Sequence, residues 1–359
     1  MLSRLRWSAA FGFRTRFISF GLLVILGAGR AGGAEGIPDT PYWFKNLVGP
    51  SGWLTPAAAS RQMIRPQSLA VDSAGNVYVT DGSYAVRKIT PKGEVTILAG
   101  SQAKPGNVDG KGSQARFGVR DWWRGPGLSG IAVDTVGNVY VADPGNQAVR
   151  KITPNGTVST LSKAGKSEYF EPIDLVVDSS GNVFVATPYA LHKITPAGKR
   201  SVLAGDSWSV APKDGTGSEA RFWFLDAITI DAAGTLFVSD AGTIRKITPA
   251  GVVTTLVGKF QDGADVAPVD GKKSAARFGR RISGIAVDAG GTLWATEPEN
   301  NSLRTVSPAG TVKTVSNRVR NFTDGVLAEA YFGGASDVAI GPKGTIYIAD
   351  TQNDAVRIL

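Results

Sequence analysis

Three aspartates lie directly before short apolar stretches that recur along the chain. Asp174, Asp226 and Asp337 precede LVV, AITI and VAI. If these stretches lie side by side, the carboxylates converge and can hold a hard cation such as calcium or magnesium. A cation of this kind can activate water or substrate. The alternative is that the carboxylates bind water or pair with arginines.

Tryptophan and arginine are concentrated in segments that do not recur. Aromatic faces can stack on a sugar or peptide, and the arginine fork can bind carboxylate or phosphate. The alternative is that the tryptophans are large apolar plugs. The predicted ligand-binding residues are Arg120, Trp122, Trp123, Arg124, Trp223, Arg280 and Arg281.

Residues that other chemistries require are scarce. The chain has no cysteine, which excludes disulfides, thiolate metal sites and thiol nucleophiles. Its one histidine, His192, cannot build a multi-histidine zinc site. No catalytic residue can be assigned, and the sequence leaves open whether the protein is an enzyme.

One pattern recurs six times and indicates the architecture that positions these residues. The segment at 66–100 contains apolar runs at 69–71, 77–80, 85–89 and 95–99, separated by turns rich in Asp, Gly, Asn and Pro. Its turn aspartate recurs at intervals of 44 to 62 residues. Four antiparallel strands per unit, repeated at this spacing, predict an all-β, six-bladed propeller. The innermost strands would line a central channel, with the three aspartates at its mouth.

The two ends of the repeat region predict how the ring closes. The last copy stops after its third strand, at Leu359. The segment FKNLVG at 44–49 resembles the fourth-strand endings TILAG and TTLVG, but no copy precedes it. We therefore expect this N-terminal strand to complete the last blade.

An acid and an arginine occur together in five blades. The second strand ends in Asp or Glu, and the third strand of the same blade carries Arg. The third blade has Thr187 and His192 instead, so the two residue types are lost together. This covariation predicts buried ion pairs across each hairpin, not a ring of metal ligands. The pairs are Asp81–Arg87, Asp143–Arg150, Asp240–Arg245, Glu297–Arg304 and Asp350–Arg357.

A second motif, DGxGxxARF or a close variant, occupies four of the connections between blades. We expect its serine, as in Ser113, to cap one helical turn and its phenylalanine to pack against the propeller. The loops would either cover blade edges or form the rim of a recognition face. The motif copies span 109–117, 214–222, 270–278 and 324–332.

The repeat VDxxGNVYVADxxNxxVRKIxPxG resembles the NHL repeat over residues 44 to 359. This resemblance implies a six-bladed propeller, and bacterial relatives with the DGxGxxARF motif mostly have no assigned function. In similar propellers of the gluconolactonase type, a Glu, an Asn and an Asp bind a metal at the channel. The Glu-Gly-Pro and Asn-Asp-Gly segments expected of that family do not occur here.

The N-terminus predicts export. Arginines precede an apolar run at 17–26, and small residues follow up to Ala34, as in a secretory signal peptide. We expect residues 1–34 to be removed, leaving one propeller domain at 35–359, although an uncleaved anchor is the alternative. Removal takes five arginines and no acid, so the net charge falls from +9 to +4. This favours a periplasmic or extracellular bacterial protein with no nucleic-acid partner and no stable membrane span.

Two functions are consistent with these features. The first is a binding module that recognises a protein, peptide or carbohydrate through its loop-rich channel face. The alternative is a metal-dependent hydrolase or lyase of the gluconolactonase type.

Overall fold

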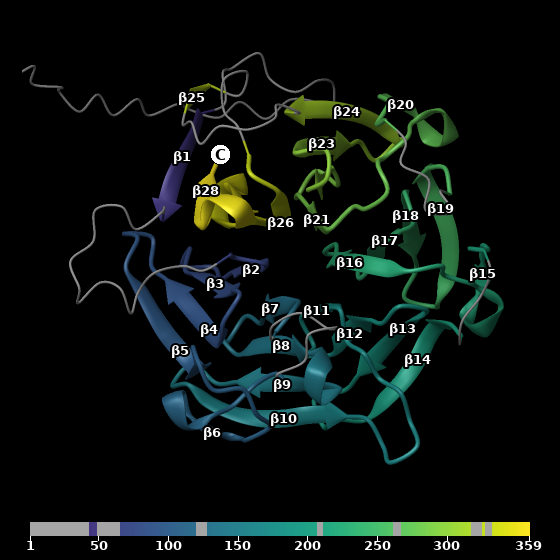
Figure 1. The fold of residues 1–359 in the computed structure, drawn as a ribbon. Coiled ribbons are helices and arrows are strands. Elements are labelled where there is room, and N and C mark those ends of the chain that lie inside the picture. Colours follow the sequence, from purple (N-terminus) through teal and green to yellow (C-terminus); the bar gives the residue numbers. More distant parts are fainter. Residues whose placement is uncertain are drawn as a thin grey trace, which may run out of the picture. The chain divides into compact units, whose positions relative to one another are not determined.

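A computed structural model shows the architecture of the chain for residues 43–48, 65–119, 128–206, 211–260, 267–316, 325–326 and 332–359. These residues belong to one compact unit, Pro41–Leu359. The unit is an all-β, six-bladed propeller, which confirms the fold prediction (Figure 1). No helix among the described residues is long and apolar enough to cross a membrane.

Each blade is an antiparallel sheet whose first three strands follow the chain from the channel outward. Blade 1 comprises β2 (Ser68–Val71), β3 (Val77–Thr80), β4 (Tyr84–Ile89) and β5 (Val95–Ser101). Blade 2 comprises β7 (Ile131–Val133), β8 (Val139–Asp143), β9 (Ala148–Ile152) and β10 (Thr157–Lys163), with β6 (Gly110–Lys111). Blade 3 comprises β11 (Asp174–Val177), β12 (Val183–Ala186), β13 (Ala190–Ile194) and β14 (Arg200–Gly205).

The next three blades follow the same order. Blade 4 comprises β16 (Leu225–Ile230), β17 (Leu236–Asp240), β18 (Thr243–Ile247) and β19 (Val252–Gly258), with β15 (Gly215–Thr216). Blade 5 comprises β21 (Gly284–Val287), β22 (Leu293–Glu297), β23 (Ser302–Val306) and β24 (Thr311–Ser316), with β20 (Gly271–Lys272). Blade 6 comprises β26 (Ala335–Ile340), β27 (Ile346–Asp350), β28 (Ala355–Ile358) and β1 (Trp43–Val48), with β25 (Gly325–Val326).

Blades 2, 4, 5 and 6 therefore have five strands where four were predicted. The extra two-residue strand comes from the DGxGxxARF segment and pairs with the outer strand of the blade that follows it. Single 3-10 turns follow three of these strands, at η2 (Gly112–Gln114), η4 (Gly217–Glu219) and η5 (Lys273–Ala275). Ser113 lies inside such a turn and no side chain caps it, so the predicted serine cap is wrong. The remaining 3-10 turns are η3 (Pro144–Asn146), η6 (Pro342–Gly344) and η7 (Thr351–Asn353).

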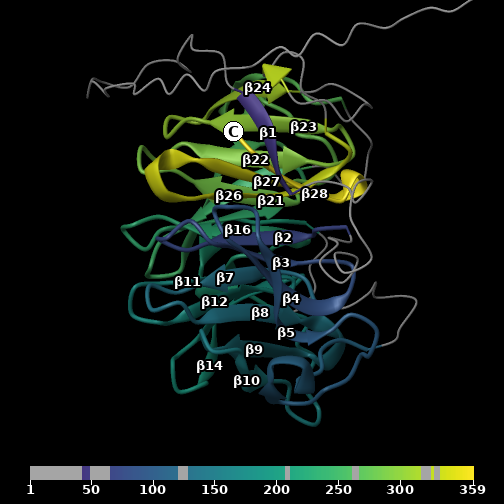
Figure 2. The same cartoon turned by 90° about the vertical axis from the view of Figure 1, so that its left-hand side faces the viewer.

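The N-terminal strand lies where the sequence places it. β1 pairs antiparallel with β28, and Figure 2 views β1 from the outside of this blade. The innermost strands β2, β7, β11, β16, β21 and β26 contact one another in a closed circle. That β1 is required to hold this circle shut remains a prediction.

The turns between the first and second strands explain the recurring aspartates. The Asp72 carboxylate accepts hydrogen bonds from the backbone N–H groups of Ala74 at 3.0 Å and Asn76 at 2.8 Å. Gly75 adopts a φ of 81°, which L side chains disfavour. These aspartates form turns, as predicted, because the short carboxylate satisfies backbone donors that the strands leave free.

The apolar core lies between neighbouring blades. Six clusters of buried side chains each join two adjacent sheets, as where Val86 of blade 1 packs in one cluster with Ile131 and Val139 of blade 2. Each sheet therefore buries both faces, which accounts for continuous apolar strands such as VYVA. Only the channel, the turns and the outer edges remain for function.

Candidate functional site

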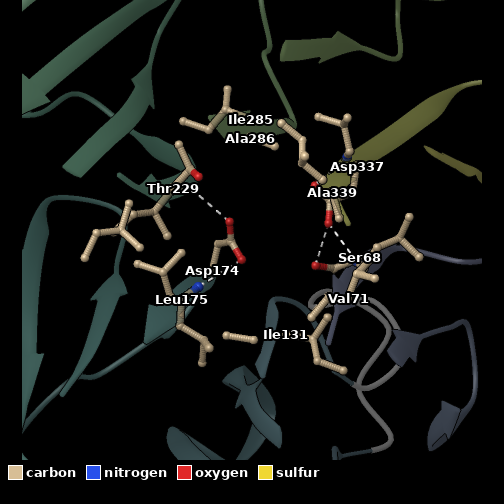
Figure 3. A pocket seen from close by; sticks show the side chains of 18 of the residues that line it. Ser68, Val71, Ile131, Asp174, Leu175, Thr229, Ile285, Ala286, Asp337 and Ala339 are labelled. Carbon is tan, nitrogen blue, oxygen red and sulfur yellow. Dashed lines mark hydrogen bonds between the residues drawn. The ribbon is translucent and has the colours of Figure 1, made fainter. Parts of the chain in front are cut away.

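One position on each innermost strand forms a ring around the channel. Because side chains alternate along a strand, residues two apart share the channel side. Aspartates occupy this ring in blades 3 and 6, which are three blades apart in either direction and thus face each other. Figure 3 shows Asp174 and Asp337 projecting into the channel from opposite sides. The residues at this position are Ser68, Gly130, Asp174, Ala227, Gly284 and Asp337. Of these, Ser68, Gly130, Asp174 and Asp337 line the cavities of the channel.

Both ring aspartates link their blade to the next one. Asp174 accepts hydrogen bonds from the backbone N–H groups of Leu175 and, in blade 4, Ile228, both at 2.9 Å. Asp337 accepts one from Val338 N–H at 2.8 Å. In blade 1 it also accepts bonds at 2.8 Å from the hydroxyl of Ser68 and the N–H of Leu69. The two carboxylates thus make equivalent contacts half a turn apart.

The preceding blade must carry glycine at each of these places. A Cβ on Gly130 would lie 2.2 Å from Oδ1 of Asp174, and one on Gly284 would lie 2.5 Å from Oδ1 of Asp337. Real Cβ contacts are never this short, so any side chain would displace the aspartate. The ring therefore repeats a three-blade pattern of glycine, aspartate and a small residue. The sequence interpretation did not assign a role to these glycines.

Burial raises the pKa of both ring carboxyls. For Asp174, loss of solvent is the largest cause, and the charge of Asp337 raises its pKa further. For Asp337, burial outweighs the opposing hydrogen bonds from Leu69, Ser68 and Val338, so its pKa also rises. The ionised pair is therefore unfavourable unless a positive charge enters the channel.

Asp226 lines the mouth cavity but lies outside the ring. It lies one residue before the ring, where Ala227 takes the ring position. Its Oδ1 accepts a 2.9 Å hydrogen bond from Nε of Arg281 in the loop before β21. Only two of the three predicted carboxylates thus occupy equivalent places, and the third pairs with an arginine that was itself predicted to bind ligand.

Two cavities that share lining residues lie along the channel. The mouth cavity, of about 350 Å³, is lined by all three aspartates together with Arg65, Arg281 and several hydroxyl and amide side chains. The lower cavity, of about 240 Å³, is lined by the inner strands. Asp174, Asp337 and Ser68 line both cavities, so they lie at the boundary between them.

Asp174 and Asp337 are the residues that could hold a cation in the channel. Each carboxylate keeps lone pairs beyond the backbone hydrogen bonds that it accepts. No group of three His, Cys, Asp or Glu side chains arranged to hold a metal occurs in the part of the chain that the structure describes. A metal bound by Asp174, Asp226 and Asp337 together stays a prediction.

The predicted recognition residues are only partly brought together. Arg281 lines the mouth. Trp223 is half-buried, lies edge-on to Phe260 with ring centroids 5.5 Å apart, and is not among the residues that line the cavities. Arg280 is exposed and also outside the cavity lining. Arg120, Trp122, Trp123 and Arg124 lie outside the described residues.

The acid–arginine pairs are confirmed as parts of the framework. Arg150 of blade 2 contacts Asp143 at 3.0 Å, and both side chains have no exposed surface. Four further pairs are equally buried, with those of blades 4, 5 and 6 at 2.8, 3.4 and 3.5 Å. A buried charge requires such a partner, which explains why acid and arginine are lost together in blade 3.

The aspartate of the DGxGxxARF motif joins these pairs, a role that was not foreseen. Asp109 lies 2.6 Å from Arg150, and its carboxylate also accepts hydrogen bonds from the N–H and hydroxyl of Thr160. The motif phenylalanine Phe117 is fully buried, with the Arg150 guanidinium over its ring. The motif thus encloses the framework arginine, and a threonine opposite that arginine in each such blade was the available sequence signal. The equivalents are Asp214–Arg245–Thr255 and Asp270–Arg304–Thr314.

His192 takes the framework position in blade 3, as predicted. Its ring packs edge-on against Phe170, with centroids 5.4 Å apart, and the guanidinium of Arg200 lies over the Phe170 ring. Burial and the nearby charge of Arg200 lower the pKa of His192 to about 4, although Glu168 opposes the shift. The histidine is therefore neutral near pH 7 and packs against the core residue Phe170.

Comparison with known proteins supports the propeller fold. No protein-family model matches the chain. Mouse Teneurin-3 is 24% identical over 352 residues, which cover 84% of this chain and 12% of Teneurin-3. The chain thus spans about 12% of the length of the curated relatives that it matches.

Two solved structures share the architecture. An auxiliary nutrient binding protein from Bacteroides thetaiotaomicron superposes with a TM-score of 0.64 at 12% identity, over 89% of this chain and 76% of that protein. A gluconolactonase from Xanthomonas campestris gives a TM-score of 0.54 at 13% identity, over 85% and 92% of the two chains. At these identities the likeness shows the fold alone.

Proposed function

We propose that this protein is an exported NHL-type propeller that binds a small polar ligand in the mouth of its central channel. The observation that carries the proposal is the mouth cavity of about 350 Å³, which has carboxylates, arginine and hydroxyl groups on its walls. A concave site with a few convergent polar groups is the usual form of a ligand pocket. The fold shared with a nutrient binding protein supports a binding role.

Export is supported by the N-terminus alone. The arginine-rich start, the apolar run at 17–26 and the small residues that follow have the layout of a secretory signal peptide. A secreted or periplasmic propeller would meet nutrients and other small solutes directly.

A metal-dependent hydrolase or lyase is the second candidate. It is favoured because Asp174, Asp226 and Asp337 line the same cavity, and because the fold is shared with a gluconolactonase. In that case Asp174 and Asp337 would hold calcium or magnesium, which would polarise a bound lactone or ester. Arg281 would then orient the substrate through its guanidinium.

Thermal unfolding separates these functions. The protein is melted with EDTA, with calcium, magnesium or manganese, and with panels of sugars, amino acids and organic acids. A ligand at about 100 times its dissociation constant adds roughly 2.7 kcal/mol and raises the melting temperature by several degrees. Binding in the channel predicts a shift with a small solute that is lost in the Asp174→Asn/Asp337→Asn variant and retained in Glu94→Gln, an exposed control. A shift with a metal alone would favour the enzyme, and no shift at all would contradict both functions.

A further inference from the structure

The ring aspartates differ from the other buried acids of the propeller in their partners. Each of the five framework acids contacts an arginine of its own blade. Asp226 contacts Arg281. Asp174 and Asp337 accept bonds only from backbone N–H groups and one hydroxyl among the residues that the structure describes. A positively charged group of a ligand would supply the missing partner.

Positive charge lies above the two carboxylates. Arg65 and Arg281 line the mouth cavity, and half of the Arg281 side chain is exposed to solvent. Asp226 occupies Nε of Arg281 and leaves other N–H donors of the guanidinium to face a ligand. Such donors bind a carboxylate in fork geometry. A ligand that enters the mouth therefore meets a site for negative charge first.

Small side chains, most of them alanine, lie below the carboxylates. Two residues beyond the ring position, each inner strand again faces the channel. Figure 3 shows Thr229, Ala286 and Ala339 along this part of the lower cavity. Because these side chains are small, they leave room below the carboxylates for a short side chain of a ligand. The side chains at this level are Ala70, Ala132, Val176, Thr229, Ala286 and Ala339.

We propose that the channel ligand is an α-amino acid with a short aliphatic side chain, or the first residue of a peptide. Its ammonium group lies between Asp174 and Asp337, its carboxylate or first peptide carbonyl faces Arg281, and its side chain enters the lower cavity. This inference rests on the proposed binding function.

Other classes of ligand match fewer of the three groups that follow one another along the channel: the arginines, the ring carboxylates and the small side chains. A bare divalent cation suits the two aspartates but is repelled by the arginines and gains nothing from the alanines. An organic anion suits the arginines and is repelled by the aspartates. A neutral sugar leaves the ring carboxylates without a positive charge. The order of arginines, carboxylates and small side chains along the channel fits a zwitterion with a short side chain.

Calorimetric titration of the purified protein with matched probes tests the proposal. The probes are L-valine, isobutylamine, which lacks the carboxylate, and N-acetyl-L-valine, which lacks the ammonium group. We expect L-valine to bind at least tenfold more tightly than either analogue. This comparison uses the unaltered protein, so it stands even if a variant fails to fold.

Variants assign each charge to a residue. Asp174→Asn with Asp337→Asn should weaken L-valine and isobutylamine at least tenfold. Arg281→Gln should weaken L-valine severalfold and leave isobutylamine unchanged, and Glu94→Gln should change neither. N-acetyl-L-valine that binds as tightly as L-valine, or calcium that binds where L-valine does not, would overturn the proposal. A sugar or organic acid that binds at the mouth instead would overturn the zwitterion and leave the binding function intact, whereas the failure of every solute would contradict both.

Discussion

Asp143 and Asp174 are the same residue type in two regions of one propeller, and their surroundings differ. Asp143 lies in the framework of blade 2, where Arg150, Asn146 and the N–H of Gly118 contact its carboxylate. Asp174 lies on the channel ring, where only backbone N–H groups do so within the described chain. The framework acid is neutralised by the fold, and the ring acid faces a cavity.

This difference separates recurring residues from functional ones. The framework pair repeats in five blades because each blade must bury the same arginine. The ring aspartate occurs twice, always after a blade that carries glycine at that position. A buried charge without a counterion reduces the stability of a fold, and such charges are common in binding sites.

The largest effect should come from the outer edge of the framework. Deletion of residues 40–50 removes β1, which pairs with β28, the strand that carries Arg357. An open edge beside a buried arginine should abolish most of the folding free energy, which is about 5 to 15 kcal/mol for a typical domain. Circular dichroism during heating should then show no cooperative transition. A chain that begins at Pro66 and melts like the full protein would refute the role of β1 in closure.

The next effect comes from breaking one framework pair. Asp143→Ala leaves the guanidinium of Arg150 buried with only the half-exposed Asp109 beside it. We expect a loss of about 3 to 5 kcal/mol in urea unfolding. Thr187→Ala is the matched change in blade 3, where only a hydrogen bond to the carbonyl of Ala190 is lost, and should cost about 1 kcal/mol. If Asp143→Ala and Thr187→Ala lost equal amounts of unfolding free energy, the ion pair of blade 2 would stabilise the fold no more than the hydrogen bond of blade 3.

The channel carboxyls should affect stability through pH. Their pKa values are raised above the ordinary 3.8, so the folded protein keeps protons that the unfolded chain has lost. The stability that the protonated ring carboxyls contribute is fully present below about pH 4 and is lost as the pH rises through the raised pKa values. The slope is up to about 1.4 kcal/mol per pH unit for each carboxyl that stays protonated.

Urea unfolding at several pH values measures that slope. Asp174→Asn with Asp337→Asn should flatten it, while Asp226 and Arg281, which also face the mouth, are present in both proteins. An identical pH profile for the variant and the unaltered protein would show that the ring carboxyls titrate normally.

The smallest effect should come from the motif aspartate. Asp109 keeps a pKa below its ordinary value, because hydrogen bonds from Arg150 and Thr160 outweigh its partial burial. Since nearly half of its side chain is exposed, water can replace much of the interaction. We expect Asp109→Asn to cost about 1 kcal/mol at neutral pH, measured against Glu94→Gln. A loss above about 3 kcal/mol would make the motif as essential as the pair that it covers.

Most of the fold could be predicted because each blade repeats the same constraint. The loss of acid and arginine together at Thr187 and His192 was enough to predict the buried pairs. Asp226 lines the channel mouth with the other two aspartates, but its ion pair with Arg281 was not predicted, because it depends on a contact between blades. The role of the glycines opposite Asp174 and Asp337 was not predicted. Glycine is required there by contacts between neighbouring blades, and the periodicity within one blade carries no information about such contacts.

The central claim is that Asp143 stabilises the fold whereas Asp174 and Asp337 do not. It is tested by the free energy of unfolding at about pH 8, where the ring carboxyls are most ionised. Asp143→Asn should lose about 2 to 4 kcal/mol, because Arg150 loses its buried counterion. Asp174→Asn with Asp337→Asn should stay within about 1 kcal/mol of the unaltered protein or exceed it. A double variant that loses as much as Asp143→Asn would make the ring aspartates part of the framework and contradict the account.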